Sequence, residues 1–383
     1  MLLPLVQILA LVATVQAAPK PPVNAVMDLQ NRAIAELKKG KGPGQGPGSQ
    51  GCSVSNAAVR KDWETMPAPE RKAYITAVQC LLKAPSKSDP ALVPGARNRY
   101  DDFVAQHINQ TETIHGTGNF LTWHRQFVYS YEKALREECK YTGYQPYWNW
   151  FAHEGDLKRS SVFDGSDTSM SGDGSFVAHD GSTGGNGNVI LPSGEGGGCL
   201  QGGPFKDMIV NLGPIHPSMK GQEKVDSNFK HNPRCLKRDL TTYTSQKWLT
   251  VDNLLNLTTG DASKSIQSFQ DEFQGRFGDG FLGLHAAAHY SIGGDAGDIY
   301  SSPVDPVFFL HHAMVDRVYW MWQALHKSEA QKIAGTITLF NLPPSRDTSL
   351  DDLIETNYLN VDPTPIKDLT DTLGKKPLCY IYQ

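Results

Sequence analysis

Two histidine-rich parts of the sequence constrain its fold more than any other feature. The first, residues 107–127, contains His107, His115 and His124 in a chain that has only 12 histidines. Residues 119–139 contain no glycine or proline and repeat apolar side chains at steps of three and four, which predicts an amphipathic helix. His124 would lie on the apolar face of that helix, where an imidazole needs a partner.

A second set of histidines lies much farther along the chain. In FLGLHAAAHY, residues 281–290, His285 and His289 are four apart with only alanines between them. A helix here would place both rings on one face. One inward histidine is most simply explained by a hydrogen bond to a buried polar group. Several inward histidines would each need such a hydrogen-bond partner, because burying an imidazole without one costs about one to several kcal/mol of folding free energy.

The segment DPVFFLHHAMVDRVYWMW, residues 305–322, predicts another buried helix. Asp305 is placed to be its N-cap and Pro306 to be its first helical residue. With that start His312 faces inward, whereas the adjacent His311 is turned away by about 100° on an ideal helix. The phase of the helix therefore favours a packing role, or a role around the site, for His311.

A bound metal would satisfy three inward histidines at once. Ligands that are all neutral imidazoles suit Zn, Cu, Ni or Fe, whereas Ca and Mg prefer oxygen and blue-copper sites need a cysteine. Zinc hydrolysis is the main rival, but HAAAH lacks the glutamate that an HExxH site uses as general base. Two sets of three histidines indicate two similar metals side by side.

Three segments, FLTWHRQFVYSYEKAL, PYWNW and DPVFFLHHAMVDR, resemble the copper-binding signatures of the type-3 copper proteins, the family of tyrosinases, catechol oxidases and haemocyanins. The resemblance implies a mainly α fold, with a four-helix bundle around a dinuclear copper site, long irregular glycine-rich loops and few short strands. It implies two copper ions as cofactors. The ligands it assigns are His107, His115 and His124 for the first copper, and His285, His289 and His312 for the second.

The resemblance extends to the end of the sequence. YIY at residues 380–382 is similar to the motif that closes the family's catalytic domain, so Tyr380 and Tyr382 are expected beside an arginine partner, for which Arg60 is the candidate. Asp316, one turn after His312, fits a carboxylate that supports a ligand, and a surface ion pair is the alternative. The resemblance implies a short form without the C-terminal lid domain of many relatives.

Two positions depart from patterns common in the family. Many members carry a cysteine two residues before the second ligand, joined to a histidine by a thioether, and here that residue is Thr113. Relatives that strongly hydroxylate monophenols often have asparagine after the first ligand of the second set, where this chain has Ala286. That asparagine is thought to orient a water together with an upstream acidic or amide residue. Gln274 is the nearest counterpart here, and Glu272 is another.

These features favour an oxidase of o-diphenols. Neutral nitrogen ligands support both copper(I) and copper(II), and a copper pair can pass two electrons to O2. Two diphenols and one O2 would give two o-quinones and two waters. A monophenol must first lose its proton, which a site without a well-placed base handles poorly. Tyrosinase-type monophenol hydroxylation is therefore the alternative, and an oxygen carrier or a zinc hydrolase is more remote. The expected partners are O2 and small phenols, with selectivity residing in residues 291–304.

The first 17 residues predict a secretory signal peptide. They form an uncharged apolar run, with Val15 and Ala17 at the −3 and −1 positions of a signal-peptidase site. Residues 18–51 combine a helical pattern with the linker GKGPGQGPGSQG, and the pair Lys38–Lys39 leaves open a propeptide or a tethered helix. A single catalytic domain is expected over residues 52–383, in an extracellular protein.

Six cysteines follow the signal, and an even number in a secreted chain predicts three disulfides, whose pairing stays open among 15 possibilities. They are Cys52, Cys80, Cys139, Cys199, Cys235 and Cys379. Two acceptors for N-glycosylation, Asn109 and Asn256, fit the same compartment. Because Asn109 lies two residues past His107, a glycan there requires its side chain to point outward.

The net charge of −4 at pH 7 gives no reason to expect nucleic acid or an anionic membrane as partner. No segment after the signal is long and apolar enough to cross a bilayer. Residues 163–204 are crowded with Gly, Ser, Asp and Asn and predict a long loop. The remaining histidines lie in loop-like or surface contexts and are not expected to be ligands: His153, His179, His216, His231 and His326.

Overall fold

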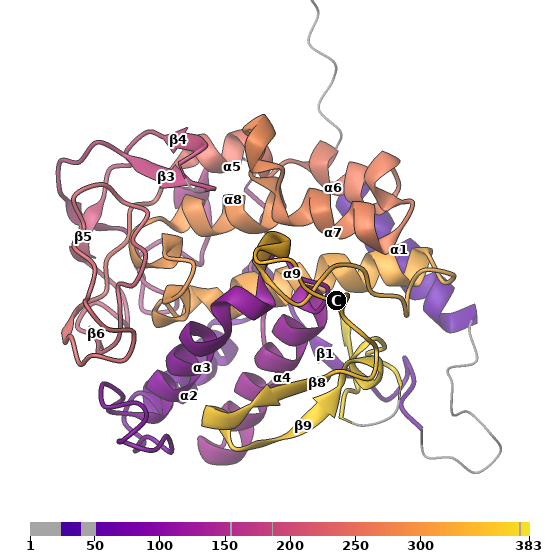
Figure 1. Ribbon diagram of the computed structural model, residues 1–383, viewed down its shortest axis with the longest axis horizontal. Helices are drawn as coiled ribbons and strands as arrows, with labels where there is room; N and C mark the ends of the chain where they lie inside the picture. Colours follow the sequence, from indigo (N-terminus) through magenta and orange to yellow (C-terminus); the bar gives the residue numbers. More distant parts are fainter. Residues whose placement is uncertain (1–23, 40–50, 154, 186, 375–376) are drawn as a thin grey trace, which may run out of the picture.

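Helices dominate the computed structural model (Figure 1), which describes residues 24–39, 51–153, 155–185, 187–374 and 377–383. Four of them surround the histidines, and α4 packs against α9, α8 against α9 and α3 against α4. They are α3 (Arg99–Ile114), α4 (Phe120–Glu138), α8 (Gly283–Ile292) and α9 (Val307–Leu325). The predicted mainly α fold with a helical bundle around the histidines is confirmed.

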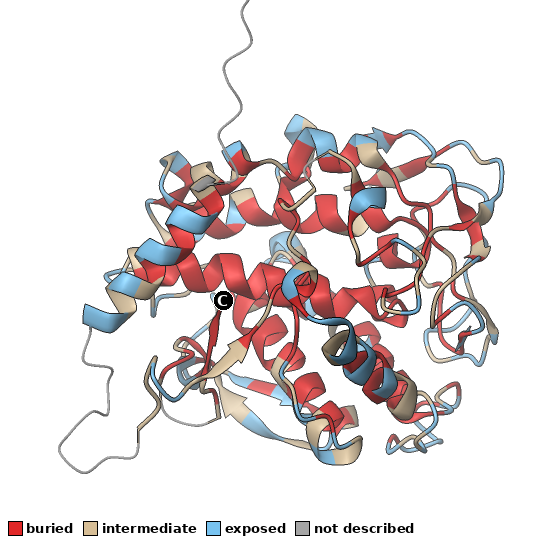
Figure 2. Cartoon of the chain, turned by 180° about the vertical axis from the view of Figure 1, so that it is seen from behind, coloured by how far each residue is buried: buried red, intermediate tan, exposed pale blue. Residues whose placement is uncertain are grey.

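Helix α9 forms the centre of the bundle. Every side chain from Val307 to Ala324 is buried, and Figure 2 shows the central helix red along its length. A helix that is apolar on all sides belongs in an interior. Its start differs by one residue from the prediction, because Pro306 is the N-cap and Val307 the first helical residue. The Asp305 carboxylate accepts a hydrogen bond from the Val307 N–H at 3.0 Å, and Arg238 donates two hydrogen bonds of 2.7 Å to the same carboxylate. Asp305 therefore supports the first turn of the helix, although it precedes the N-cap residue.

Shorter helices enclose the bundle. The helix expected in the N-terminal extension is α1 (Asn24–Lys39), which packs on α9 and leaves its other face exposed (Figure 2). Helix α2 (Ala68–Leu81) lies against α4, while three others cover α8. These are α5 (Thr242–Trp248), α6 (Val251–Thr258) and α7 (Ile266–Gln274).

The strands are short, as the sequence predicted, and in the described residues they form two-stranded sheets. The parallel pair is β1 (Ala58–Arg60) with β10 (Tyr380–Tyr382), which joins the two ends of the expected catalytic domain. The antiparallel pairs are β2 (Gly174–Phe176) with β5 (Gly197–Leu200), β3 (Ser182–Gly184) with β4 (Val189–Leu191), β6 (Ile209–Val210) with β7 (Arg234–Cys235), and β8 (Leu353–Thr356) with β9 (Val361–Pro365). Strands β2 to β5 lie in the glycine-rich excursion, beside α8 (Figure 1).

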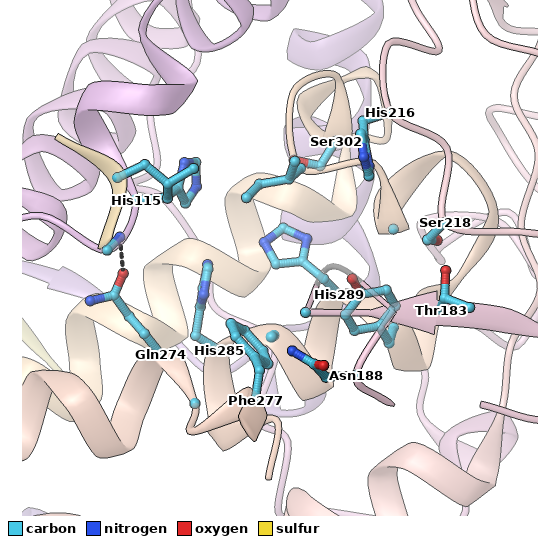
Figure 3. A pocket seen from close by; sticks show the side chains of 18 of the residues that line it. His115, Thr183, Asn188, His216, Ser218, Gln274, Phe277, His285, His289 and Ser302 are labelled. Atoms are coloured by element: carbon cyan, nitrogen blue, oxygen red, sulfur yellow. Dashed lines mark hydrogen bonds between the residues drawn. The ribbon is translucent and has the colours of Figure 1, made fainter. Parts of the chain in front are cut away.

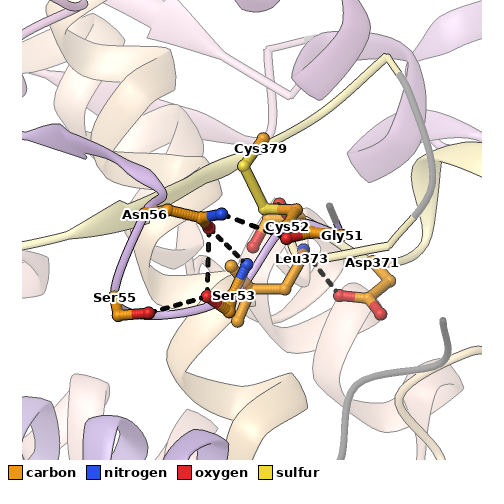
Figure 4. The surroundings of a disulfide bond; sticks show 9 residues. Gly51, Cys52, Ser53, Ser55, Asn56, Asp371, Leu373 and Cys379 are labelled. Atoms are coloured by element: carbon orange, nitrogen blue, oxygen red, sulfur yellow. Dashed lines mark hydrogen bonds between the residues drawn. A yellow bond between two sulfur atoms is a disulfide. The ribbon is translucent and has the colours of Figure 1, made fainter. Parts of the chain in front are cut away.

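All six cysteines form disulfides, which confirms that prediction and fixes the pairing. Cys52–Cys379 joins the segment before β1 to the residue before β10 (Figure 4), Cys80–Cys139 links the ends of α2 and α4, and Cys199–Cys235 ties the excursion to β7. Figure 4 also shows Asn56, whose side chain accepts from the Ser53 N–H at 2.7 Å and donates to the Gly51 carbonyl at 3.1 Å. The first disulfide therefore lies in a segment that local hydrogen bonds already hold.

None of the helices described combines the length and the apolar content that a bilayer-spanning segment needs. The predicted signal peptide, residues 1–17, and most of the glycine-proline linker lie outside the described residues.

Candidate dinuclear metal centre

The six histidines predicted as ligands converge from four helices. His107 lies in α3 and His115 is its C-cap residue, His124 lies in α4, His285 and His289 lie in α8, and His312 lies in α9. Candidate ligand atoms of the first three lie within 4.8 Å of one another, and the same limit holds for a second group of His285, His289, His311 and His312. Each group can therefore reach one metal ion.

The two groups adjoin. The rings of His124 and His312, one from each group, stack with centroids 4.4 Å apart and planes at 14°. The rings of His115 and His285 face each other at 6.1 Å. In Figure 3, His115, His285 and His289 point into one shared space. Two metal ions held by these groups would be neighbours.

Hydrogen bonds to the backbone fix the orientation of four of the rings. Each places Nδ1 against a carbonyl oxygen: His107 with Tyr300 (2.8 Å), His115 with Thr111 (3.0 Å), His124 with Phe120 (2.8 Å), and His289 with Ala296 (3.0 Å). Because a carbonyl only accepts, Nδ1 carries the hydrogen and Nε2 keeps its lone pair. This is the tautomer in which a histidine binds a metal through Nε2.

Burial keeps the rings neutral. It lowers the pKa of His115 to about 4 and that of His289 to about 3, and holds the pKa values of His107, His124, His285 and His312 well below their usual range. The Nε2 atoms of His107, His124 and His285 are buried without a hydrogen-bond partner within the described residues. Buried polar atoms are normally satisfied, so this concentration of free lone pairs fits a metal centre.

His311 lies in the second group, which the sequence analysis did not expect. Both of its ring nitrogens are buried without a partner in the part of the chain described. Its ring stacks on His285, with centroids 5.5 Å apart and planes at 18°, and lies edge-on to His289 at 4.3 Å. Because α8 packs alongside α9, two adjacent positions of α9 both face the histidines of α8. Helix phase alone does not carry that information.

Asp316 holds the closing motif together instead of supporting a ligand. It is buried rather than on the surface, and its carboxylate accepts from Arg125 Nε at 2.6 Å and from the hydroxyls of Tyr380 and Tyr382 at 2.5 and 2.6 Å. Burial acts to raise its pKa, but Arg125 and Arg60 hold that pKa below the usual value. Among the residues described, none of its hydrogen-bond partners is a histidine, so the structure shows neither of the two roles that the sequence suggested for Asp316.

Arg60 completes the Asp316 cluster, as the resemblance implied. Its guanidinium lies 3.7 Å from the centre of the Tyr380 ring, and Nη1 donates to the Tyr382 hydroxyl at 3.0 Å and to Asp316 at 3.3 Å. Nε donates to the Glu132 carboxylate at 3.0 Å. The motif therefore joins β1, α4, α9 and β10 through one buried network.

The two candidates for orienting water differ in position. Gln274 lies at the site, where its Oε1 accepts the N–H of Gly116 at 2.8 Å (Figure 3). This bond assigns the amide oxygen to Gly116 and leaves the NH2 group as donor. Glu272 points elsewhere, because its carboxylate accepts from the Asn256 side chain at 3.2 Å and pairs with Arg276.

An uncharged pocket leads to the histidines. It has a volume of about 810 Å3 and reaches His115, His285 and His289, with Ala286 in its wall. Five of its lining residues belong to the segment predicted to control selectivity: Ala296, Gly297, Ile299, Tyr300 and Ser302. Among the lining residues described, none is Asp, Glu, Lys or Arg. His216 also lines the pocket but belongs to neither metal group.

Comparisons with known proteins agree with this geometry. Residues 97–325 match the common central domain of tyrosinase. The chain is 41% identical over 337 residues to the tyrosinase-like protein orsC of Emericella nidulans, which covers 83% of this chain and 88% of that protein. It is 37% identical over 351 residues to the N-acetyl-6-hydroxytryptophan oxidase ivoB of the same organism, covering 87% and 94%.

A solved structure is similar along almost the whole chain. The polyphenol oxidase of Thermothelomyces thermophila, solved as a mutant, superposes with a TM-score of 0.86 at 35% identity, covering 95% of this chain and 99% of that one. Together with the domain match and the identity to fungal relatives, this similarity establishes the family. The chain belongs to the tyrosinase family of type-3 copper proteins.

Proposed function

We propose that this protein is a secreted dicopper oxidase that converts o-diphenols to o-quinones and reduces O2 to water. The family fold implies a dinuclear copper site, and the two histidine groups are compatible with one. His107, His115 and His124 would hold one copper, and His285, His289 and His312 the other. When bound, the copper pair supplies the two-electron transfer between diphenol and O2.

The contribution of the protein is to prepare neutral, oriented ligands and a reachable site. The Nδ1 bonds to backbone carbonyls hold the rings in place before metal binds, which limits the ordering cost of binding. The lowered pKa values keep protons off the Nε2 atoms at neutral pH, where a proton would compete with a metal ion. The pocket admits an uncharged phenol from outside, which favours an oxidase over an oxygen carrier with a closed site.

The preference for diphenols is supported by the side chains described around the pocket. Hydroxylation of a monophenol requires loss of the phenolic proton, which a carboxylate or an oriented water would take. The described lining residues include no carboxylate. The Gln274 oxygen is engaged by Gly116, and Ala286 has no side chain that could hold a water. A tyrosinase with substantial monophenol activity remains the alternative proposal.

Copper-loaded protein assayed on phenol and on catechol side by side tests this proposal. We expect rapid oxygen consumption with catechol and a much slower rate with phenol. Comparable rates would favour the monophenol alternative, and no consumption with catechol by protein carrying two copper ions per chain would refute the oxidase. Metal analysis separates the zinc hydrolase, since one zinc ion and no copper after purification would contradict the whole proposal.

Secretion and domain boundaries are part of the same proposal. Residues 1–17 would be removed as a signal peptide, 18–51 would form an extension or propeptide, and 52–383 would form one catalytic domain. The three disulfides support an oxidising compartment. Asn109 is exposed, so a glycan there would point away from His107, whereas Asn256 is half-buried and donates to Glu272. Mass spectrometry of the secreted protein would test each boundary and both glycans.

A further inference from the structure

The pocket is much larger than a single phenol ring requires. A dry cavity of about 150 Å3 is enough for benzene, whereas this pocket has a volume of about 810 Å3. Two phenylalanines, Phe277 and Phe340, belong to its lining, and Phe340 is 49% exposed. The size and lining of the pocket indicate the class of substrate, and this inference rests on the oxidase function proposed above.

The backbone of Phe340 is held in a conformation that its side chain disfavours. Its φ and ψ angles are 50° and 30°, and the next residue, Asn341, also has a positive φ of 56°. Asparagine tolerates this left-handed region, whereas a bulky aromatic residue rarely occupies it. Such outliers persist where the surroundings impose them and occur preferentially at functional sites.

Hydrogen bonds around the turn impose this conformation. The Phe340 N–H donates to the Gly116 carbonyl at 3.2 Å, and the Asn341 N–H donates to the Thr338 carbonyl at 3.0 Å. The Asn341 side chain accepts from the Ser345 N–H at 2.8 Å. These bonds fix the turn to the residue that directly follows the predicted ligand His115. The ring of Phe340 is therefore held at a set distance from the metal centre.

The ring of Phe340 is 49% exposed although it lines the pocket. It stands edge-on to Phe277, with ring centroids 6.2 Å apart and planes at 86°. Glycines allow the close packing of this rim, because a Cβ at Gly185 would lie 2.5 Å from the Phe277 ring and one at Gly116 would lie 2.8 Å from the Phe340 ring. The two rings, which we call the aromatic rim, present apolar surface that nothing described covers fully.

We propose that the aromatic rim of Phe277 and Phe340 holds the second ring of a two-ring o-diphenol while the diol ring reaches the histidines. Two edge-to-face rings offer a flat aromatic group one face and one edge, the geometries that aromatic pairs prefer. The lining described carries no formal charge, so an uncharged second ring is favoured over an acidic or basic substituent. The substrate class is therefore an extended aryl-substituted catechol.

The test compares 4-phenylcatechol with catechol on copper-loaded protein. We expect Phe340→Ala to lower the ratio of kcat/KM for 4-phenylcatechol over catechol by about tenfold, because the stacking partner of the outer ring is lost. Phe340→Tyr should retain most of the ratio. Phe340→Gly should lower it as much as alanine does, yet raise Tm, because glycine fits the positive φ.

The matched control is Phe176→Ala. Phe176 is 73% exposed and does not line the pocket, so its substitution should leave the ratio unchanged. A second readout does not use turnover: calorimetry under nitrogen should show that Phe340→Ala weakens binding of 4-phenylphenol by about tenfold. An unchanged ratio and unchanged binding in Phe340→Ala would overturn the inference while leaving catechol oxidation intact. Loss of catechol oxidation by the unaltered protein would instead refute the proposed function.

Discussion

Two buried polar clusters on the same pair of helices have opposite chemistry. On α4, His124 belongs to the metal centre and its neighbour Arg125 belongs to the cluster around Asp316. On α9, His312 belongs to the metal centre, and Asp316, one turn later, belongs to the other cluster. The Asp316 cluster is a network of hydrogen bonds around a carboxylate, and it leaves one buried donor, Arg60 Nη2, without a described partner. The histidine cluster instead leaves several unpartnered ring nitrogens that converge on one space.

The difference indicates what each cluster is for. Arg60, Arg125, Tyr380 and Tyr382 donate four hydrogen bonds to the Asp316 carboxylate, so its charge is compensated within the chain. It joins strands from both ends of the chain to the two central helices. The histidine rings are equally buried but incomplete, and a completed site requires a ligand. Function is therefore expected where several unpaired ring nitrogens converge within reach of one ion, as the histidines do.

The strongest test of this contrast is to remove one histidine of the metal centre. In His312→Ala we expect one copper per chain instead of two and a loss of catechol oxidase activity of at least about a thousandfold, since a metal pair supplies several kcal/mol of catalysis. Because the His312 ring stacks on Phe308 but has no described hydrogen-bond partner outside the centre, the metal-free variant should still fold. Copper analysis, oxygen consumption and circular dichroism would measure the three outcomes.

Two other histidines provide controls: His311 in α9, and His326, the C-cap residue that follows α9. His326→Ala removes a ring that bonds the Thr258 carbonyl at 2.9 Å far from the centre, and should leave copper content unchanged. His311→Ala should also retain two copper ions if the assignment of His312 as ligand holds. A loss of one copper in His311→Ala, with two retained in His312→Ala, would exchange the roles of these neighbours.

The matching change in the satisfied cluster is Asp316→Ala, which should reduce stability rather than metal binding directly. Removing one partner of a buried ion pair costs about 3–5 kcal/mol, because Arg125 stays buried without its carboxylate while Arg60 keeps only Glu132. The exposed pair of Arg346 and Asp352 has similarly short bonds of 2.8 and 2.9 Å. Asp352→Ala should nevertheless cost only ~0–1 kcal/mol. Urea unfolding of both variants would measure the loss of unfolding free energy, and equal losses would mean that burial of the ion pair is unimportant.

The histidine cluster should also make the metal-free protein sensitive to acid. Burial lowers the pKa of His115 to about 4 and of His289 to about 3, from an ordinary value of 6.5. Above pH 6.5 neither ring is charged in either state, and the effect is absent. As the pH falls below 6.5 the unfolded chain binds protons that the native chain excludes, so stability falls by about 1.4 kcal/mol per pH unit for each ring.

Asp316 has the opposite sign and a different range of pH. Its pKa is held below the usual 3.8, so its contribution is present above 3.8 and is lost only as the pH falls through the lower native value. Between pH 4.5 and 6.5, a plot of the unfolding free energy against pH should therefore be less steep for metal-free His115→Gln than for the unaltered protein. The difference in slope should correspond to about one proton fewer taken up on unfolding. Equal slopes would mean that the buried rings titrate normally.

Local periodicity and spacing predicted the helix of residues 119–139 and inward positions for His124, His285, His289 and His312, whereas His107 and His115 were assigned by the resemblance to the family. Helix α4 was predicted over residues 119–139 and begins at Phe120. His124 and His312 could be placed on inward faces from the spacing of their neighbours alone. The parts of the site that depend on one helix only were thus accessible from sequence.

The relations between distant elements were not accessible in this way. His311 faces the site because α8 packs beside α9, and Asp316 meets the ends of the chain because β1 pairs with β10. The position of Phe340 depends on a turn that bonds to the residue after His115. Hydrophobic periodicity gives each helix a buried face but does not say which neighbour covers it.

A smaller expected effect concerns the wall of the histidine cluster. Ala286 follows His285 and offers no polar atom, which fits a site that oxidises diphenols but deprotonates monophenols poorly. Ala286→Asn adds an amide to a pocket in which the described lining lacks a carboxylate. We expect it to raise the rate with phenol, relative to the rate with catechol, severalfold. The gain should stay below about tenfold, which is the factor that a change of one pKa unit represents. Ala286→Val, which adds bulk without a polar atom, is the control, because equal gains in both variants would point to pocket shape rather than to an oriented water. An amide that raises only the phenol rate would show that the monophenol reaction lacks a polar group beside His285.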